Sequence, residues 1–351
     1  MFDRARFPIL SRGALAACIL AATACGSDGA LGPGGHVIVS KTDAYSIVVL
    51  PPLAGDASAL ASDMNESGVI VGRSFATDGG GRPVQWVAGH ATALADPSNS
   101  AGGAVSVNAH GTILGTIDST AVLWINGSID TVMHNGSPQW INDSTEPPSK
   151  INDRGQILFP LWLHETEPHY GFMIYDLPAD AWTLVPLPNP PPGIVDFNNK
   201  GQAIGVYHVL AIGGGHGPQQ DTMEYGGVSL PSSSIGGLHW NPLDLTDSSE
   251  VLIGDGGSVL FGTAASSVAL NQFFGGPGAA RANNNDVVVG TGPDSSLYLW
   301  RKSANVTELV NAGKGWKFDD VLKLNDNGAI LAHGQNVNTG QSGSVVLTPI
   351  G

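Results

Sequence analysis

Two stretches of the chain hold the side chains that could most readily do chemistry. They are "LWLHETEPHYG", residues 161–171, and "YHVLAIGGGHGPQQDTMEY", residues 207–225. Imidazole and carboxylate groups at this density are ligands of zinc and other transition metals. A carboxylate pair could also act as acid and base in cleaving a polysaccharide. The candidate residues are His164, Glu165, His169, His216 and Asp221.

The sequence around these residues matches no catalytic motif. The first stretch lacks the H-E-x-x-H spacing of zinc hydrolases, and Pro168 opposes the helix which that motif requires. "GGGHG" at residues 213–217 is followed by neither a lysine nor a helix, and no nucleophile elbow or dinucleotide fingerprint occurs. We therefore expect solvated loop residues, no metal, no cofactor and no enzymatic activity. A hydrolase or lyase acting on polysaccharide is the alternative.

Three tryptophans lie in irregular segments and form a second group of candidates. They are Trp140, Trp240 and Trp316. Exposed aromatic rings on a rigid scaffold suit stacking against sugars or holding a protein partner. The alternative is that they fill hydrophobic gaps between structural units.

A repeated motif indicates which elements position these loops. "MNESGVIVG" begins at residue 64, and related segments follow at 107, 151, 197, 246, 282 and 324, with spacings of 36 to 49 residues. The asparagine position of the seven units is Asn65, Asn108, Asn152, Asn198, Asp247, Asn283 and Asn325. In this alignment, Glu250 and Asp286 replace the glycine of the motif.

Each unit continues with a short apolar segment that usually ends in an aromatic residue. These residues are Trp86, Trp124, Tyr175, Tyr225, Phe261 and Trp300. A further apolar run follows each of them, so a complete unit contains four short strands. A period near 43 with four strands per unit is typical of a propeller blade. We predict an all-β, seven-bladed β-propeller of four-stranded antiparallel blades; six or eight blades are the alternatives.

The motif itself has the composition of a tight turn. The asparagine side chain can bond a backbone N–H two residues later, and the glycine can adopt the left-handed conformation. The turn residues are Asn65 and Gly68, Asn108 and Gly111, Asn152 and Gly155, Asn198 and Gly201, and Asn325 and Gly328.

The ends of the chain predict how the ring closes. "AYSIVVLPPL", residues 44–53, resembles a fourth strand that precedes the first unit, and the last unit lacks its own fourth strand. We expect the N-terminal strand to complete the last blade beside residues 345–347, which removes exposed sheet edges. The short turns then lie on one face of the ring and the long loops on the other, where we expect binding.

The units resemble the bacterial HAF repeat, which runs roughly A-x-x-I-N-x-x-G-x-V-V-G and then H-A-F-L-W. The resemblance covers about residues 45–351, although His-Ala-Phe itself is replaced by segments such as "PVQ" and "AVL". It implies an extracellular, propeller-like protein, and it carries no known activity.

The first residues form a targeting segment. Arg4, Arg6 and Arg12 precede an apolar run that ends "LAATACGSD". The small residues before Cys25 resemble a bacterial lipobox, although Ala22 stands where leucine is usual. We predict a lipoprotein signal peptide (1–24), lipidation of Cys25, a flexible tether (25–43) and a propeller (44–351). The chain is then exported to the cell envelope, at the outer membrane or cell surface; a secreted or periplasmic protein is the alternative.

The charge balance narrows the partners. The chain carries 15 basic and 30 acidic residues, for a net charge of −15. This charge opposes binding to nucleic acid and to anionic membrane surfaces, and we attribute the acidity to surface solubility. We expect a monomer that contacts the membrane only through its lipid anchor. The predicted function is a binding or scaffold module for an unknown protein or glycan.

Overall fold

The computed structural model describes residues 38–39, 45–98, 100–134, 137–138, 150–163, 169–187, 193–209, 219–230, 241–255, 258–270, 274 and 280–350. All regular secondary structure in these ranges is β-strand. None of the described segments is an apolar helix long enough to cross a membrane.

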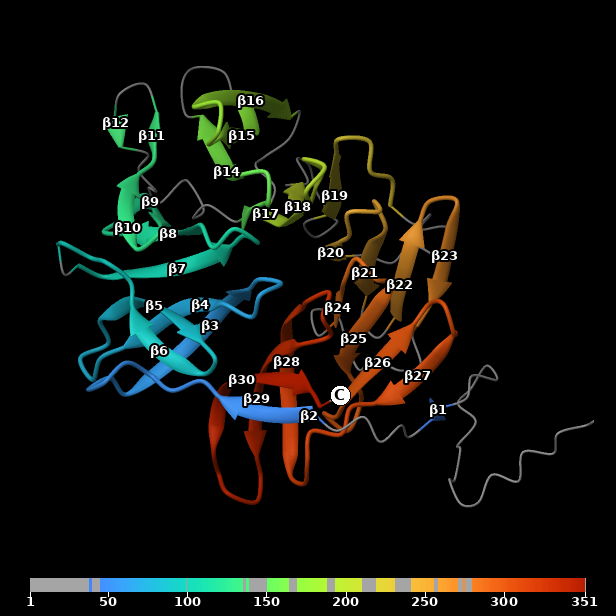
Figure 1. Cartoon of the computed structure of the whole chain (residues 1–351). Coiled ribbons are helices and arrows are strands. Elements are labelled where there is room, and N and C mark those ends of the chain that lie inside the picture. The colour runs from blue at the N-terminus through green and yellow to red at the C-terminus, as the bar shows by residue number, and fades with distance from the viewer. Residues whose placement is uncertain are drawn as a thin grey trace, which may run out of the picture.

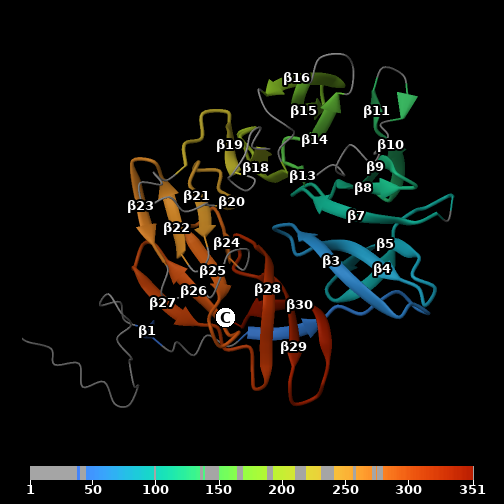
Figure 2. The same cartoon turned by 180° about the vertical axis from the view of Figure 1, so that it is seen from behind.

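Seven antiparallel sheets follow one another around a ring (Figure 1 and Figure 2), so the predicted seven-bladed propeller is confirmed. The first two blades are β3 (Ser58–Met64), β4 (Ile70–Phe75), β5 (Gly81–Val87) and β6 (His90–Ala93), then β7 (Gly102–Val107), β8 (Ile113–Ile117), β9 (Thr120–Ile125) and β10 (Ser128–Thr131). A small hairpin of β11 (Met133–His134) and β12 (Ser137–Pro138) follows them.

The middle of the ring contains blades 3 to 5. Blade 3 is β13 (Lys150–Ile151), β14 (Gln156–Leu163), β15 (His169–Asp176) and β16 (Ala181–Leu187). The described part of blade 4 is β17 (Gly193–Phe197), β18 (Ala203–Val209) and β19 (Gln219–Tyr225). Blade 5 is β20 (Asn241–Leu245), β21 (Val251–Asp255), β22 (Ser258–Thr263) and β23 (Ser266–Ala269).

Blades 6 and 7 complete the ring. Blade 6 is β24 (Ala280–Ala282), β25 (Val287–Thr291), β26 (Leu297–Arg301) and β27 (Val306–Leu309), with β1 (Ile38–Val39) parallel to β27 at its edge. Blade 7 is β28 (Trp316–Leu324), β29 (Ile330–Asn336), β30 (Ser342–Pro349) and β2 (Tyr45–Val49). Of the predicted tether, 25–43, the structure thus describes only the two residues of β1.

The N-terminal strand β2 pairs with β30 from the other end of the chain. Val49 lies opposite Val345, and Ile47 lies opposite Leu347, which is the register expected from the sequence. The backbone N–H of Leu50 extends this pairing by donating to the carbonyl of Ser344 at 2.9 Å. The last blade is therefore built from both ends of the chain.

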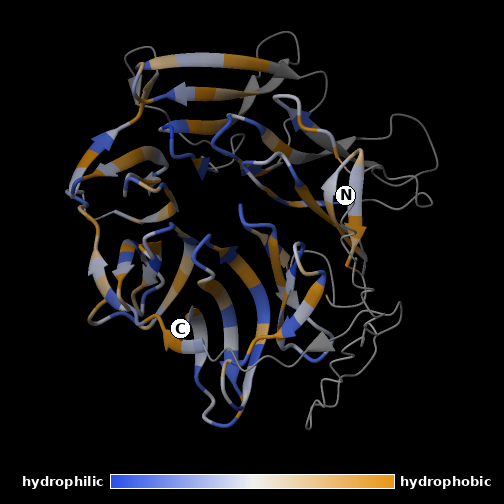
Figure 3. Ribbon diagram, turned by 45° about the vertical axis from the view of Figure 1, so that its right-hand side comes forward, coloured by the Kyte–Doolittle hydropathy of each residue, from blue (hydrophilic) through white to orange (hydrophobic). Residues whose placement is uncertain are grey.

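Hydrophobic side chains fill every interface between neighbouring blades, and five of the seven interfaces include aromatic residues from the ends of the third strands. Trp86, Trp124, Phe261 and Trp300 are at most 1% exposed. The indole nitrogens of Trp86 and Trp124 donate to the carbonyls of Pro51 and Ala95, each at 2.7 Å. Figure 3 shows apolar residues through the body of the blades and polar residues at their turns and near the centre of the ring. Polar side chains are therefore concentrated at the turns and toward the centre of the ring.

Candidate functional site

The repeated motif forms the turn between the first and second strands of each blade. In blade 1, Asn65 Oδ1 accepts the N–H groups of Ser67 at 3.1 Å and Val69 at 2.9 Å. Gly68 has a φ of 81°, in the left-handed region. The same arrangement recurs at Asn108 and Gly111, Asn152 and Gly155, and Asn198 and Gly201. At Asn325, with Gly328 in the left-handed region, the side-chain oxygen accepts the N–H of Ala329.

The asparagine amides also join each blade to the next, and we call this set the amide ring. Asn65 Nδ2 donates to the carbonyl of Asn108 at 2.9 Å. At the closure of the ring, Asn325 Nδ2 donates to the carbonyl of Asn65 at 3.3 Å. The remaining links run from Asn108 to Asn152, from Asn152 to Asn198, from Asn198 to Thr246, and from Asn283 to Asn325. Each asparagine is therefore both a turn residue and an inter-blade contact.

The fifth unit is shifted by one residue from the predicted alignment. Thr246, not Asp247, occupies the asparagine position, because its N–H donates to the carbonyl of Glu250 as Asn65 does to Val69. Ser249, not Glu250, takes the place of glycine, with a φ of 71°. The predicted alignment was shifted because Asp247 and the serine after it have the polarity of the motif one position later than its true start.

The hydroxyl of Thr246 is engaged within its own turn, with Ser248 and Glu250. Among the described residues, no side-chain bond runs from Thr246 to blade 6. A different contact joins these two blades, because the ammonium of Lys302 in blade 6 pairs with the carboxylate of Glu250 in blade 5. Lys302 thereby compensates for the missing amide.

The residue after each asparagine position forms a second circle, which we call the rim. Its members are Glu66, Ala109, Asp153, Asn199, Asp247, Asn284 and Asp326. In six of the seven blades the backbone N–H of the rim residue donates to a side-chain oxygen of the rim residue in the next blade, at 2.6 to 2.8 Å. The series begins with the N–H of Ala109 and ends at the carboxylate of Glu66. The circle is open at one point. Ala109 offers no oxygen, so the N–H of Glu66 has no partner among the described residues.

The residue two positions before each asparagine position lies deeper in the channel, and these residues form the floor. They are Asp63, Ser106, Lys150, Asp196, Asp244, Arg281 and Lys323. Register shifts in the innermost strands of blades 1, 2, 4, 5 and 7 precede them. Such bulges redirect side chains, and here they place the floor residues toward the centre of the ring.

Floor residues also link consecutive blades. Asp63 accepts the hydroxyl of Ser106 at 2.7 Å and the N–H of Val107 at 3.0 Å. The remaining contacts of the floor are Ser106 with Ile151, Lys150 with Asp196, Asp196 with Leu245, Asp244 with Ala282, and Arg281 with Leu322. The series stops at Lys323, whose ammonium makes no hydrogen bond or ion pair with any described residue.

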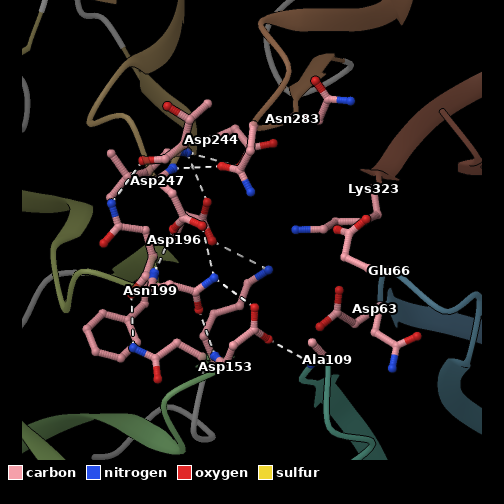
Figure 4. Close-up of a pocket in the computed structure, with 18 of the residues that line it drawn as sticks. Asp63, Glu66, Ala109, Asp153, Asp196, Asn199, Asp244, Asp247, Asn283 and Lys323 are labelled. Atoms are coloured by element: carbon pink, nitrogen blue, oxygen red, sulfur yellow. Dashed lines mark hydrogen bonds and ion pairs between the residues drawn. The ribbon is translucent and has the colours of Figure 1, made fainter. Parts of the chain in front are cut away.

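Rim and floor enclose a polar cavity of about 180 Å³ at the turn end of the central channel (Figure 4). Seven carboxylates and two lysines line it. They are Asp63, Glu66, Asp153, Asp196, Asp244, Asp247, Asp326, Lys150 and Lys323. Pockets that bury drug-sized ligands span roughly 300–1,000 Å³, so this cavity suits one small polar molecule or several waters. No group of three or more candidate ligands in the described part of the chain has metal-site geometry.

Two buried carboxylates in the floor share the N–H of Leu245, at 2.9 Å from Asp196 and 3.0 Å from Asp244. Burial and the adjacent charge of Asp196 raise the pKa of Asp244 to about 7. Burial opposes ionisation of Asp196 as well, but the charge of Lys150 and the hydrogen bond from Asp244 hold its pKa well below the usual range. Below about pH 7 the pair therefore shares one proton, the state in which paired carboxylates can exchange a proton.

The charges around Lys323 explain why its ammonium stays ionised. Burial disfavours the charged form, but the carboxylates of Asp244, Asp63 and Asp196 outweigh it and raise the pKa of Lys323 above its usual range. Burial and repulsion from Asp326 raise the pKa of Glu66, although the N–H of Asp326 partly opposes them. The cavity thus has a strongly negative potential at neutral pH.

The residues proposed from sequence lie elsewhere. Trp316 begins β28, is partly buried, stacks on Phe318 at 6.2 Å between ring centroids, and packs against the core between blades 6 and 7. His169 begins β15 and Asp221 lies in β19, where the structure describes only their backbone. Trp140, Trp240, His164, Glu165, His216 and Cys25 lie outside the described residues.

Sequence reasoning did not select the cavity, which lies at the end of the ring opposite to the one expected to bind. One signal could have found its rim. Six of the seven units carry an acid or amide directly after the asparagine position. Such regularity indicates that these side chains share a structural position.

The fold is similar to several solved propellers. YCF48 bound to D1 peptide has a TM-score of 0.53 and 11% identity, and the match covers 90% of this chain and 99% of that one. An oligogalacturonate lyase from Vibrio parahaemolyticus has a TM-score of 0.53 and 10% identity, covering 91% and 98%. The propeller domain of the trilobed protease from Pyrococcus furiosus has a TM-score of 0.52 and 9% identity, covering 83% and 95%.

These identities show the shared fold alone. No protein-family model matches the chain, and no curated protein matches its sequence.

Replacing Asn108 separates its two roles. Asn108→Ala removes the oxygen that accepts the N–H groups of His110 and Thr112 as well as the amide bound to Asn152. We expect a loss of about 2–4 kcal/mol in the free energy of unfolding, and about 1 kcal/mol for Asn108→Thr, which keeps a turn acceptor as Thr246 does. Urea unfolding measures both. The exposed Asn338→Ala is the control, and a loss in Asn108→Ala no larger than in this control would contradict the double role.

Stability should depend on the proton held by Asp244. Its pKa is raised to about 7 in the fold, so its contribution to stability is present at low pH and is lost as the pH rises through about 7. We expect the melting temperature to fall by a few degrees between about pH 6 and about pH 8.5, and Asp244→Asn to reduce that fall. Thermal unfolding followed by circular dichroism measures it. The exposed Asp118→Asn should retain the wild-type dependence, and equal slopes in all three proteins would refute the assignment.

Proposed function

We propose that the chain is an exported binding propeller, without catalytic activity, held at the cell envelope by a lipid on Cys25. Its partner is a protein or a glycan, and the ring acts as a monomeric scaffold. The outer membrane or the cell surface is the proposed location.

One observation carries the assignment to binding: the floor carboxylates of the cavity are held in place by hydrogen bonds between blades. Asp63, Asp196 and Asp244 each accept a backbone N–H from the following blade. These bonds fix the carboxylates in place, and a fixed polar surface lowers the entropic cost of recognising a ligand. The shared proton of Asp196 and Asp244 is accounted for by their burial side by side.

The comparisons are compatible with this proposal and do not select it. Among proteins with this fold, one is described as bound to a peptide and another is a lyase. A propeller scaffold carries either kind of function, so the residues of the site must decide. The membrane anchor is supported by the sequence alone, through Arg4, Arg6 and Arg12 and the small residues before Cys25.

Binding and catalysis can be separated in one experiment. The full chain, solubilised in a mild detergent, is applied to glycan and peptide arrays. Each ligand that it binds is then incubated with the protein, and the products are analysed by mass spectrometry. We expect ligands that are retained and recovered intact. Cleavage of a bound polysaccharide at a rate proportional to protein concentration would replace the binding proposal with the lyase or hydrolase alternative.

The anchor has its own test. In a bacterial host with a lipoprotein pathway, the wild-type chain should fractionate with membranes, and mass spectrometry should detect a lipid on its N-terminal cysteine. Cys25→Ala should move the protein to the soluble fraction. Cys18→Ala is the matched control, because residue 18 lies within the predicted signal peptide. Membrane association of Cys25→Ala equal to that of wild type would disprove anchoring through this residue.

A further inference from the structure

The rim and the floor are both interrupted on the same side of the cavity. The rim is open where Ala109 of blade 2 leaves the N–H of Glu66 in blade 1 without an acceptor. The floor is open where Lys323 of blade 7 makes no hydrogen bond or ion pair with Asp63 of blade 1, although the charge of that carboxylate helps to stabilise the ammonium. Figure 4 shows Lys323 extending toward the open centre of the cavity, with Glu66 and Asp63 beside it. Two hydrogen-bond donors of adjacent blades therefore lack acceptors in one small space.

The two gaps differ from the other interruption of the ring. At Thr246 the missing amide is compensated by the ion pair of Lys302 with Glu250. At the other two gaps the neighbouring blades are also joined by other bonds, but no described residue accepts a hydrogen bond from the N–H of Glu66 or from the ammonium of Lys323. Both residues line the cavity, so a solvent molecule or a ligand there can accept from these donors, and a ligand that does so is favoured over one that cannot.

The charges around the gap restrict what that occupant can be. An anion would satisfy the two donors, but it would face seven carboxylates against two lysines. A cation would be attracted by the carboxylates, but it would be repelled by Lys323 and would leave both donors unpaired. A neutral molecule with several hydroxyl groups satisfies both sets, because each hydroxyl donates one hydrogen bond and accepts others.

We propose that this sector of the cavity, between Lys323, Glu66 and Ala109, binds a neutral polyhydroxylated molecule of monosaccharide size. Its hydroxyl oxygens accept from the ammonium of Lys323 and from the N–H of Glu66. Its hydroxyl protons are donated to the carboxylates of Asp63 and Glu66. The inference deepens the proposed binding function, since it names a ligand class and a site on the turn face of the ring.

The size and the polarity of the space agree with this ligand. A cavity of about 180 Å³ is too small for a folded peptide segment, and its lining is carboxylate, amide, hydroxyl and ammonium rather than apolar. The carboxylates of Asp63 and Glu66 are held by inter-blade bonds, so they are arranged before the ligand arrives.

The test uses the residue that the other blades place at the gap. Asn199 and Asn284 occupy the rim position of Ala109 in blades 4 and 6, and the side-chain oxygen of each accepts the backbone N–H of the preceding blade's rim residue. Ala109→Asn should therefore close the rim, satisfy the N–H of Glu66 and fill the space for the ligand. Ala265→Asn, in the exposed turn that follows β22, makes the same change away from the cavity.

Binding to the full chain is measured by isothermal titration calorimetry and ligand-observed NMR. The probes are glucose, galactose, mannose and xylose, with galacturonate as the anion and glucosamine as the cation. We expect at least one neutral sugar to bind more tightly than both charged ones. Ala109→Asn should weaken it by roughly tenfold or more, the loss of about one hydrogen bond, while Ala265→Asn leaves it unchanged. Without sugar, the melting temperature of Ala109→Asn should be no lower than that of wild type. This result would show that the variant loses binding because its side chain fills the site and not because it misfolds.

Three outcomes would overturn the inference: no binding of any neutral sugar, tighter binding of galacturonate or glucosamine, or equal binding by Ala109→Asn and wild type. Array ligands that bind Ala109→Asn as well as wild type would leave the proposed binding function intact while removing this site from it. Lys323→Met gives an independent check, because it removes the second donor without filling the gap. If this variant folds, it should also weaken sugar binding.

Discussion

The bond from each asparagine amide to the carbonyl of the next blade is the interaction on which the ring depends. The oxygen of Asn65 holds the turn of its own blade, and the nitrogen of the same side chain holds blade 2. Turn geometry and ring closure are thereby coupled, since a turn that relaxes also releases its neighbour. These side chains are buried, and a polar bond is both stronger and more costly to lose in such surroundings. The bond from Asn325 to Asn65 closes the amide ring, and it does so independently of the pairing of β2 with β30.

The acidity of the channel follows from the same geometry. Each turn directs backbone N–H groups toward the next blade, and converging N–H groups favour negative charge. The carboxylates of Asp153, Asp247 and Asp326 accept these groups in the rim, as Asp63, Asp196 and Asp244 do in the floor. Part of the net negative charge of the chain is thus structural rather than a general feature of the surface. Lys150 and Lys323 offset a fraction of it within the cavity.

The fold was predictable because each blade repeats two local signals, a turn and a buried aromatic residue, that depend on neighbouring residues in sequence. Asn65 and Gly68 were recognisable as a turn, and Trp86 as core, for that reason. The second role of Asn65 was not predictable, because its partner Asn108 is 43 residues away and the bond depends on the spacing between blades. The prediction placed the asparagine position of the fifth unit one residue too late, at Asp247 instead of Thr246, because an aspartate is as common as an asparagine in such turns. The floor was missed because bulges, which no residue type specifies, place Asp63, Asp196 and Lys323 in the channel.

Because the same contacts recur in successive blades, the positions at which a contact is missing can be identified by comparing the blades. Where Thr246 breaks the amide ring, the ion pair of Lys302 with Glu250 joins the same two blades. Two further interruptions, of the rim at Ala109 and of the floor at Lys323, lie next to blade 1, and there no described residue accepts a hydrogen bond from the N–H of Glu66 or the ammonium of Lys323. Their meeting in one sector, where the donors of Glu66 and Lys323 face one cavity, is the arrangement expected if the ring gives up stability there to leave groups free for a ligand.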